Sequence, residues 1–357
     1  MESSAHGKVL LLGGYLVLFP EYFGVVVECS PKITTLASHN QSIVVDSPRF
    51  KLSACYNNSG TLISGNSNPF VEESLKAAIQ CLGAFGITLE GLRLEIQADE
   101  EFYTSGKTGL GSSAALVVSL TSAILKHCNY WSPGLLHFCA LLANAKAQKK
   151  IGSGFDISCA IFGSQVFQRS QSKYFADVLE GKKQLEPQEL LQEFQTDNWD
   201  KVTPYSLHHT YQLVLCVGGE GSDTRNMVKG VLSWKTQNPE ESQLLFNQVF
   251  EIIKVAKELL ETASNKAQLK QESFALKRKL KEISDLSGQE VLPSVVFEEL
   301  KALDELEDVV FSSVPGAGGY DAFYCVVEKP NWEEASNYLL AHCPRLHILN
   351  VTQNKIT

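Results

Sequence analysis

The sequence lacks the features that define several large classes of protein. None of its apolar runs approaches the roughly 20 residues that a membrane-spanning helix requires, so we expect no membrane association. The first residues carry no basic start of the kind found in signal peptides, and the apolar run after Lys8 is interrupted by Gly13 and Gly14. With 31 basic residues against 40 acidic ones, the formal net charge of -9 disfavours a nucleic-acid partner.

Cysteines paired for metal binding or for disulfides are also missing. Nine cysteines are spread singly along the 357 residues, without a C-x-x-C pair and without a histidine at metal-ligand spacing. An odd and dispersed set of this kind is typical of reduced, buried thiols. We therefore expect a cytoplasmic protein with neither a zinc centre nor a disulfide framework.

Carboxylates are absent from one long internal window. Between Phe102 and Phe155 there is no Asp or Glu, and the first acid after this window is Asp156. In an acidic chain, such a window fits a site for negative ligands, and it fits equally a solvated lysine face that arose by chance. The lysines within it are Lys107, Lys126, Lys146, Lys149 and Lys150.

A loop rich in glycine and serine, residues 107–115, lies inside this window and leads directly into an apolar helical run. Unpaired N–H groups and the positive end of the helix dipole make such a helix start a natural anion site. Gly109 and Gly111 let the backbone close around a phosphate without hindrance from side chains. Ser112 and Ser113 can cap the helix, bind a phosphate oxygen or ligate Mg²⁺.

Two better-known phosphate loops do not fit. No segment supplies the Walker pattern G-x-x-x-x-G-K-[ST]. Residues 109–114 match the dinucleotide pattern G-x-G-x-x-A, but they follow the polar stretch 99–105 and not an apolar strand. The acid that would bind a ribose roughly 20 residues later is excluded by the carboxylate-free window. A Rossmann domain with hydride chemistry is therefore not expected.

Hydrophobic periodicity predicts a chain of mixed α and β structure. Strands are expected at 8–18, 24–28, 42–46, 92–97, 165–169, 213–217, 309–314 and 322–327. Helices are expected at 69–85, 112–128, 133–147 and 156–162, and as one bent helix or two helices over 242–283. Residues 177–209 are polar and irregular, and we expect them to contain one short helix and to join two halves of the chain.

Three glycine-rich loops, taken in order, carry a resemblance to a known family. The first is Lys8-Val-Leu-Leu-Leu-Gly-Gly-Tyr15, the second Gly109-Leu-Gly-Ser-Ser-Ala-Ala115 and the third Pro315-Gly-Ala-Gly-Gly-Tyr-Asp321. Over nearly its whole length the chain resembles the GHMP small-molecule kinases. That resemblance implies an α+β fold with an N-terminal ribosomal-S5-like domain over 1–205, a C-terminal ferredoxin-like domain over 206–357, and an active site in the cleft between them.

Within this family, the loops resemble the branch that phosphorylates (R)-5-phosphomevalonate in fungi and plants. Gly13-Gly14-Tyr15 stands where mevalonate kinases and galactokinases carry Gly-Glu-His. The segments 147–156 and 221–228 resemble the signature and the substrate loop of that branch. Gly-Phe-Asp-Ile at 154–157 differs from the Ala-Cys-Arg-Ser of the related decarboxylases, which disfavours their reaction.

The resemblance implies transfer of the γ-phosphoryl group of ATP to the phosphate of phosphomevalonate, with Mg²⁺ as cofactor, in isoprenoid and sterol synthesis. One of the two serines, Ser112 or Ser113, would ligate Mg²⁺, and Lys107 would neutralise the transferring phosphoryl group. ATP and phosphomevalonate are the partners expected of a chain taken to be a monomer or a weak dimer. The residues assigned to the ATP phosphates are Gly109, Leu110, Gly111, Ser112, Ser113, Ala114 and Ala115.

The acceptor side of the site is implied residue by residue in the same way. Lys8 is the candidate for the bridging charge on the acceptor phosphate. Asp156 matches the catalytic aspartate of the family, but an acceptor phosphate, with a second pKa of about 6, is already ionised near pH 7 and needs a base less than an alcohol does. Asp156 is therefore a base, a metal ligand, an orienter of Lys8 or a helix cap. The other residues assigned to acceptor binding are Tyr15, Ser153, Gly154, Ser222, Thr224, Gly318 and Gly319.

Two alternatives stay open at this point. One is another GHMP kinase that acts on mevalonate, homoserine or a sugar, although a sugar is uncharged and would not need so many cations near the cleft. The other is a catalytically inactive member of the fold that serves as a sensor or regulator. Such a protein would be expected to lose Lys107, Asp156 or the serine pair, and all of these are present.

Overall fold

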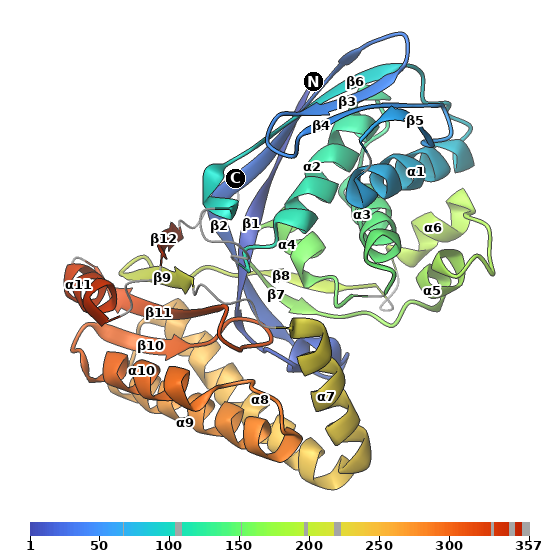
Figure 1. Cartoon of the computed structure of the whole chain (residues 1–357). Helices are drawn as coiled ribbons and strands as arrows, with labels where there is room; N and C mark the ends of the chain where they lie inside the picture. Colours follow the sequence, from blue (N-terminus) through green and yellow to red (C-terminus); the bar gives the residue numbers. More distant parts are fainter. Residues whose placement is uncertain are drawn as a thin grey trace.

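Two β-sheets, each covered by helices, organise the chain (Figure 1). The computed structural model describes residues 1–66, 68–103, 109–150, 152–195, 199–217, 223–329, 332–342 and 347–351. Within these residues the first sheet has eight strands, all before residue 205, and the second has four strands, all after residue 210. The chain changes sheets where we expect it to divide, and the division into domains at residue 205 itself stays a prediction.

Two long antiparallel strands, β1 (Glu2–Leu12) and β2 (Gly24–His39), run through the middle of the first sheet. At the start of β1, buried and exposed residues alternate, which is the pattern of a strand with one face in water. From Val9 to Leu12 every residue is buried, because helices cover one face there and the C-terminal half covers the other. The apolar ends of the two strands thus form the floor on which both halves meet.

Shorter strands extend the first sheet on both sides. They are β3 (Ile43–Ser47), β4 (Leu52–Tyr56), β5 (Leu62–Gly65), β6 (Leu92–Ala98), β7 (Gln165–Gln168) and β8 (Lys201–Pro204). The order is β5-β4-β3-β6-β2-β7-β8, with β1 paired to β2. Strands β3 and β6 run parallel, so a crossover that includes residues 69–84 connects them.

Helices α1 to α4 cover one face of this sheet (Figure 1). Asn68 caps the first of them by accepting the N–H groups of Phe70 and Val71, and a proline follows the cap, as helix starts prefer. The second helix is buried along Ala114–Leu125, which explains why its sequence is apolar on nearly every side. The helices of this half are α1 (Pro69–Ala84), α2 (Ser112–His127), α3 (Pro133–Gln148), α4 (Phe155–Phe162), α5 (Lys173–Leu179) and α6 (Pro187–Glu193).

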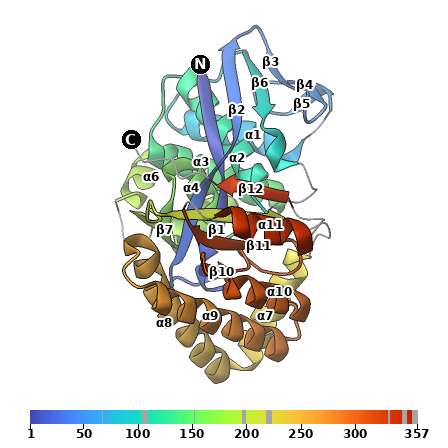
Figure 2. The same ribbon diagram turned by 90° about the vertical axis from the view of Figure 1, so that its left-hand side faces the viewer.

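The second sheet is antiparallel, in the order β10-β11-β9-β12. Its strands are β9 (Tyr211–Val217), β10 (Val309–Ser313), β11 (Ala322–Glu328) and β12 (His347–Val351). Its helices are α7 (Thr224–Gln237), α8 (Pro239–Thr262), α9 (Lys266–Ser287), α10 (Ser294–Glu305) and α11 (Trp332–His342). Helices α9 and α10 pack against β10, α7 and α8 pack against α9, and α11 contacts β11 (Figure 2).

Two expectations about elements change, and a third is narrowed to one of its two alternatives. The strand expected over 8–18 begins earlier and ends at Leu12, because Gly13 turns the chain at a φ of +103° into the 3₁₀ turn η1 (Leu16–Leu18). The region 177–209 contains helix α6 and strand β8, and β8 depends on pairing with β7, which local sequence does not show. The segment 242–283 is two helices, separated at Ala263, where φ is +50°.

Several elements were not expected at all. Strand β5 is largely exposed and four residues long, so it has no alternating pattern to reveal it. The 3₁₀ turn η2 (Glu100–Phe102) is equally short. Strands β4 and β12 and helices α10 and α11 were also missed. The missed strands and the turn η2 are three to five residues long, so tertiary pairing outweighs local preference there. Helix α10 is different, because Val296, Leu300 and Leu303 are buried at helical spacing, and the sequence analysis overlooked this pattern.

The turn after β1 locks the two halves together. The Tyr22 hydroxyl donates to Asn247 Oδ1 of α8 at 2.7 Å. The rings of Phe19 and Phe246 lie 5.8 Å apart, centroid to centroid, across the same junction.

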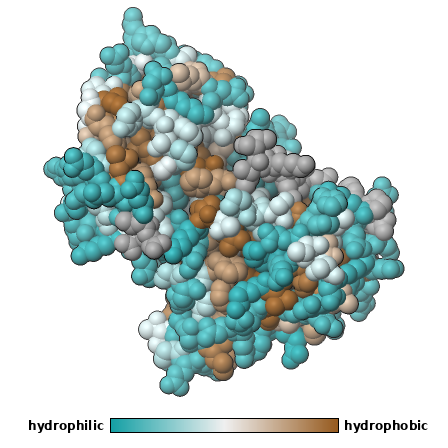
Figure 3. Space-filling model, turned by 180° about the vertical axis from the view of Figure 1, so that it is seen from behind, coloured by the Kyte–Doolittle hydropathy of each residue, from teal (hydrophilic) through white to brown (hydrophobic). Residues whose placement is uncertain are grey.

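Seen from behind, the surface is mostly hydrophilic, with apolar patches scattered among polar side chains (Figure 3). No helix within the described residues is long and apolar enough to cross a membrane.

Candidate active site

The second glycine-rich loop is held in place by buried Leu110, and the glycines on either side are exposed or half-buried. Leu110 is fully buried, and its carbonyl oxygen accepts the N–H of Lys8 at 2.8 Å. Gly109 and Gly111 on either side adopt φ values of +70° and +77°, which favour glycine. A Cβ at Gly111 would also lie 2.9 Å from Lys8 Cε. The loop therefore presents backbone at these two positions.

Helix α2 begins directly after this loop. Gly111 is its cap residue, and no side chain among the described residues caps it there. The first N–H groups of the helix therefore point into the space in front of it, where an anion can accept hydrogen bonds from them. The N–H of Ala115 bonds back to Gly111 O at 3.1 Å, so the helix ladder already uses this donor. The side chains of Ala114 and Ala115 are buried. Of these two residues, only Ala114 can therefore offer its backbone N–H to an anion.

Lys8 reaches over the loop from strand β1. Its Nζ donates to Gly109 O at 2.7 Å and lies 5.3 Å from the ring centroid of Phe155. Phe155 is the first residue of α4, and Asp156 is the second, after the cap residue Gly154 with a φ of +84°. Asp156 is therefore not the helix cap. The carboxylate accepts the adjacent N–H of Ile157 at 3.0 Å through Oδ1.

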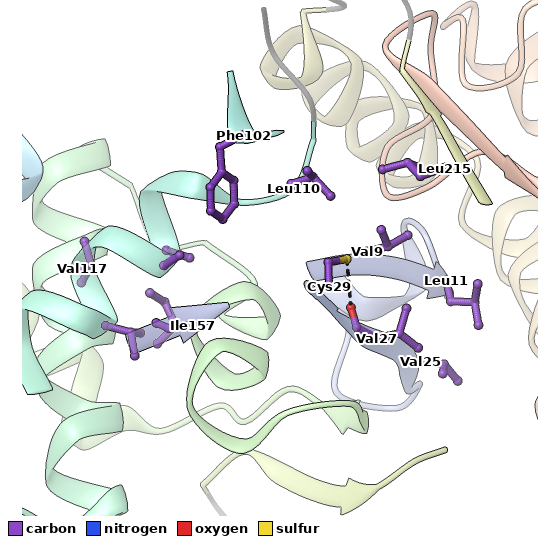
Figure 4. Close-up of a cluster of buried hydrophobic side chains, with 14 of the residues drawn as sticks. Val9, Leu11, Val25, Val27, Cys29, Phe102, Leu110, Val117, Ile157 and Leu215 are labelled. Atoms are coloured by element: carbon purple, nitrogen blue, oxygen red, sulfur yellow. Dashed lines mark hydrogen bonds between the residues drawn. The ribbon is translucent and has the colours of Figure 1, made fainter. Parts of the chain in front are cut away.

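A cleft between the halves brings eight of the expected residues together. It encloses about 1540 Å³, its open mouth included. The expected residues in its wall are Lys8, Gly109, Gly111, Ser112, Ser113, Asp156, Thr224 and Gly318. Figure 4 shows the apolar floor beneath it, where Val9 and Leu11 of β1 lie beside Val25 and Val27 of β2, and Leu215 of β9 comes from the other half. Lys107 and Ser222 lie outside the described residues.

The cleft also contains charged residues that the sequence analysis did not assign. Lys150 and Arg225 add positive charge to its wall, and Asp321 adds a carboxylate. Arg225 follows Thr224 at the start of α7, whose cap Asp223 accepts the N–H of Asn226 at 3.2 Å. An exposed cation on a helix is common, so only the position of α7 opposite α2 distinguishes Arg225 from a solvated side chain.

The third loop requires glycine for a packing reason. A Cβ at Gly318 would lie 1.9 Å from the carbonyl oxygen of Val291, and φ at Gly318 is +77°. The N–H of Gly319 donates to that same oxygen at 3.1 Å. Gly318 is in the wall of the cleft and Gly319 is not. The loop is thus pressed against the segment that precedes α10.

Tyr15 lies apart from the cleft wall. Its side chain is buried, and its hydroxyl donates to the carbonyl oxygen of Ala317 in the third loop at 3.0 Å. Burial raises the pKa of this phenol above its usual value. The structure therefore uses Tyr15 to join the first and third loops, and the expected role in orienting the acceptor stays a prediction.

Ser153 and Gly154 line a second hollow beside the cleft, on the other side of the start of α4. Arg169 and Asp200, which the sequence analysis missed, share this hollow. Arg169 Nη1 donates to Leu18 O at 3.2 Å, and the N–H of Ser170 donates to Asp200 Oδ1 at 2.6 Å. Nothing in the local sequence distinguishes Arg169 from any other cation at the end of a strand.

The pKa of Asp200, the acid in this hollow, is shifted from its usual value. Burial raises the pKa of Asp200 to about 6, against the lowering effects of the Ser170 hydrogen bond and of Arg169. His137 Nε2 lies 3.5 Å from Asp200 Oδ2, but burial lowers the pKa of His137 to about 3, so the imidazole is neutral. The pair is therefore not an ion pair, and Arg169 is the charged neighbour of the carboxylate.

Comparison with known proteins agrees with the three loops. Residues 71–164 match the family model for the GHMP kinases N terminal domain. The chain is 33% identical to the phosphomevalonate kinase of Gibberella zeae, over 89% of this chain and 86% of the relative. It is 31% identical to that of Candida albicans, over 91% and 88%. The fold matches Streptococcus pneumoniae phosphomevalonate kinase, solved in complex with phosphomevalonate and AMPPNP, with a TM-score of 0.78 and 17% identity over 100% of both chains. The expected fold is confirmed.

Proposed function

Because this chain belongs to the phosphomevalonate kinases of the GHMP kinase family, we propose that it transfers the γ-phosphoryl group of ATP to the phosphate of (R)-5-phosphomevalonate, releasing ADP and the diphosphate. One observation carries the proposal: the start of α2, Lys8 and Arg225 face a single cleft. Both reactants are anions, and phosphoryl transfer depends mainly on positioning and on neutralising charge.

The start of α2 is the site for the ATP phosphates. Its first N–H groups bind phosphate oxygens, and the helix dipole favours their negative charge. Gly109 and Gly111 let the backbone approach the nucleotide closely, while buried Leu110 holds the loop in place. Lys107, two residues before Gly109, neutralises the transferring phosphoryl group in this proposal.

Mg²⁺ fits the oxygen donors of the cleft. The hydroxyls of Ser112 and Ser113 and the carboxylate of Asp156 are all in its wall, and Mg²⁺ prefers such hard oxygen ligands. In the part of the chain that the structure describes, no group of three or more His, Cys, Asp or Glu residues could hold a metal alone. The ion would therefore be held by one serine together with phosphate oxygens, and it would offset the charge of the ATP phosphates.

Lys8 and Asp156 form the acceptor side of the cleft. The Lys8 ammonium group, fixed on Gly109 O, is placed to contact both the incoming phosphate and the transferring group. Because the acceptor phosphate is already ionised near pH 7, Asp156 need not remove a proton, and it orients Lys8 or the metal ion instead. Thr224 and Arg225 bind the acceptor from the opposite half. The hollow beside Ser153 extends the acceptor site toward Arg169.

The setting of the reaction is part of the proposal. We place the enzyme in the cytoplasm, in isoprenoid and sterol synthesis, as a monomer or a weak dimer. None of the eight cysteines in the described residues forms a disulfide, and six of them are buried. Thiols in this state are typical of a reducing compartment.

An ADP-release assay with four acceptors tests the function. Phosphomevalonate, mevalonate, homoserine and galactose are compared, each with and without Mg²⁺. We expect rapid ADP release with phosphomevalonate alone, and only when Mg²⁺ is present. Equal or faster turnover of mevalonate would assign the chain to the mevalonate-kinase alternative. Absence of turnover with all four, together with measurable ATP binding, would support the inactive regulator.

A further inference from the structure

A buried carboxylate lies beneath the active-site cleft. Glu28 is in the apolar part of strand β2 and is only 9% exposed. The N–H of Glu28 donates to the hydroxyl of Ser164 at 2.9 Å, which fixes the strand at this point. A carboxylate removed from water destabilises a fold unless a cation or several donors compensate it. A cation or hydrogen-bond donors must therefore lie near the Glu28 carboxylate, and a cation is the stronger partner.

Lys8 stands directly opposite Glu28. Strands β1 and β2 are antiparallel, and their register pairs these two residues. Side chains that are directly opposite in an antiparallel pair project from the same face, with Cβ atoms about 4.5–5.5 Å apart. The carboxylate of Glu28 and the long stem of Lys8 thus start from adjacent points, and the stem continues to Gly109 O, 2.7 Å from Nζ.

Two buried thiols lie near both of these charges. Burial is the main cause that raises the pKa of Cys29, and Lys8 lowers it while Glu28 raises it. Burial also raises the pKa of Cys159, on α4, and there Cys29, Glu28 and Asp156 add to the increase while Lys8 opposes it. Cys159 packs with Leu10 and Val26, which lie on the same faces of their strands as Lys8 and Glu28.

On the premise of the proposed function, we propose that Glu28 is a positioning residue, which holds the Lys8 ammonium group over the start of α2, in place for the transferring phosphoryl group. A lysine has three donors and a flexible four-carbon stem. Gly109 O accepts from one of these donors, Glu28 is paired with Lys8 across the two strands, and Lys8 is in the wall of the cleft. The reacting phosphate then meets a positive charge that is already aligned, and this alignment lowers the barrier to phosphoryl transfer.

This role predicts opposite effects on turnover and on binding. In Glu28→Gln the shape of the side chain is kept, and the negative charge is lost. We expect kcat to fall at least tenfold, because the Lys8 ammonium group is no longer held in one place. The KM for the anionic acceptor is expected to stay the same or to fall, because a negative charge near its binding site has been removed. Glu28→Asp, which keeps the charge, should retain more of the wild-type kcat than Glu28→Gln.

A double-mutant cycle tests whether Glu28 acts through Lys8. The variants are Lys8→Met, Glu28→Gln and the double variant, each assayed for kcat and for its midpoint of urea unfolding. Once Lys8 is replaced, Glu28→Gln should cause no further loss of kcat. Lys8→Met leaves the buried carboxylate without this cation and should lower the unfolding midpoint, and the second substitution should restore part of it. Glu95→Gln is the control, because Glu95 is on the same sheet, exposed, and paired with Arg93 at 2.9 Å; its kcat should match the wild type.

The outcomes are separable from those of the proposed function. The unfolding cycle needs no substrate, so it reports the coupling of Lys8 and Glu28 even if another acceptor proves to be the natural one. Additive effects of the two substitutions on both kcat and the unfolding midpoint would overturn the proposal. So would equal falls in kcat in Glu28→Gln and Glu28→Asp, accompanied by a higher KM for the acceptor, because that pattern indicates general disruption of the site.

Discussion

The hydroxyl of Tyr15 donates a hydrogen bond to the carbonyl oxygen of Ala317 at 3.0 Å, and this contact joins loops that are 302 residues apart in the sequence. The backbone approaches closely at the same place, because a Cβ at Gly14 would lie 3.0 Å from Gly316 O. The Tyr324 hydroxyl donates to Leu11 O nearby. The first and third glycine-rich loops are thereby held together at one end of the cleft.

Tyr15→Phe tests what this contact contributes. The substitution leaves the Ala317 carbonyl without its donor, and we expect a loss of about 1–2 kcal/mol of unfolding free energy. The KM for phosphomevalonate should stay close to the wild-type value, because Tyr15 is outside the cleft wall. Urea unfolding and steady-state kinetics give the two values. A large rise in acceptor KM at unchanged stability would instead support direct contact between Tyr15 and the acceptor.

Gly318→Ala should disturb the third loop far more than Gly316→Ala. Both glycines have positive φ, +77° and +63°, so each substitution costs roughly 1–2 kcal/mol in backbone strain. Only at Gly318 does the new Cβ meet the Val291 carbonyl oxygen, whereas nothing lies within 4 Å of a Cβ at Gly316. We expect Gly318→Ala to lose additional stability and to raise both KM values. Similar unfolding midpoints for the two variants would show that the loop relaxes around the clash.

Lys107→Met tests the charge assigned to the phosphoryl group. Lys107 lies outside the described residues, so its role stays a prediction from the sequence. If it stabilises the transition state, kcat should fall by on the order of 10², or about 3 kcal/mol, with a smaller change in ATP affinity. Lys126→Met is the matched control, because Lys126 is in the same carboxylate-free window but at the far end of α2, above the ring of Trp131. A folded Lys107→Met enzyme with near-normal kcat would leave Lys8 and Mg²⁺ as the neutralising charges.

The raised pKa of Asp200 predicts that the stability of the fold depends on pH. Its folded-state pKa is raised by burial from 3.8 to about 6, so the folded protein holds the proton more tightly than the unfolded chain does. The stability associated with the protonated acid is complete below pH 3.8 and is lost as the pH rises through about 6. Asp200→Asn mimics the protonated form and should become more stable than the wild type across this window, by roughly 3 kcal/mol at most.

Urea unfolding of both proteins between pH 4 and pH 8 measures this difference. The advantage of Asp200→Asn should grow up to about pH 6 and then level off. A constant difference at every pH would mean that Asp200 titrates alike in the folded and unfolded states. Asp46→Asn serves as a control, because Asp46 is on the same sheet and its partner Arg93, 2.8 Å away, is half exposed.

The expected elements that the structure confirms are those with a strong local signal. Helix α2 follows from the glycine-rich loop before it and from a mostly apolar run, and α1 follows from Asn68 and Pro69 at its start. Some of the missed elements, such as β8 and β12, depend on partners far away in the sequence. Strand β8, for instance, exists because Lys201–Pro204 pairs with β7, and its four residues carry no pattern of their own.

The candidate site divides in the same way. The sequence by itself determined the three loops and the carboxylate-free window, because glycine requirements, helix starts and charge content are local properties. Only the tertiary structure decided that Tyr15 contacts Ala317, that Ser153 faces Arg169, and that Glu28 stands opposite Lys8. The last of these depends on strand register, and a slip of one residue would turn Glu28 to the other face of the sheet. Register and packing are set by the whole fold, and no motif records them.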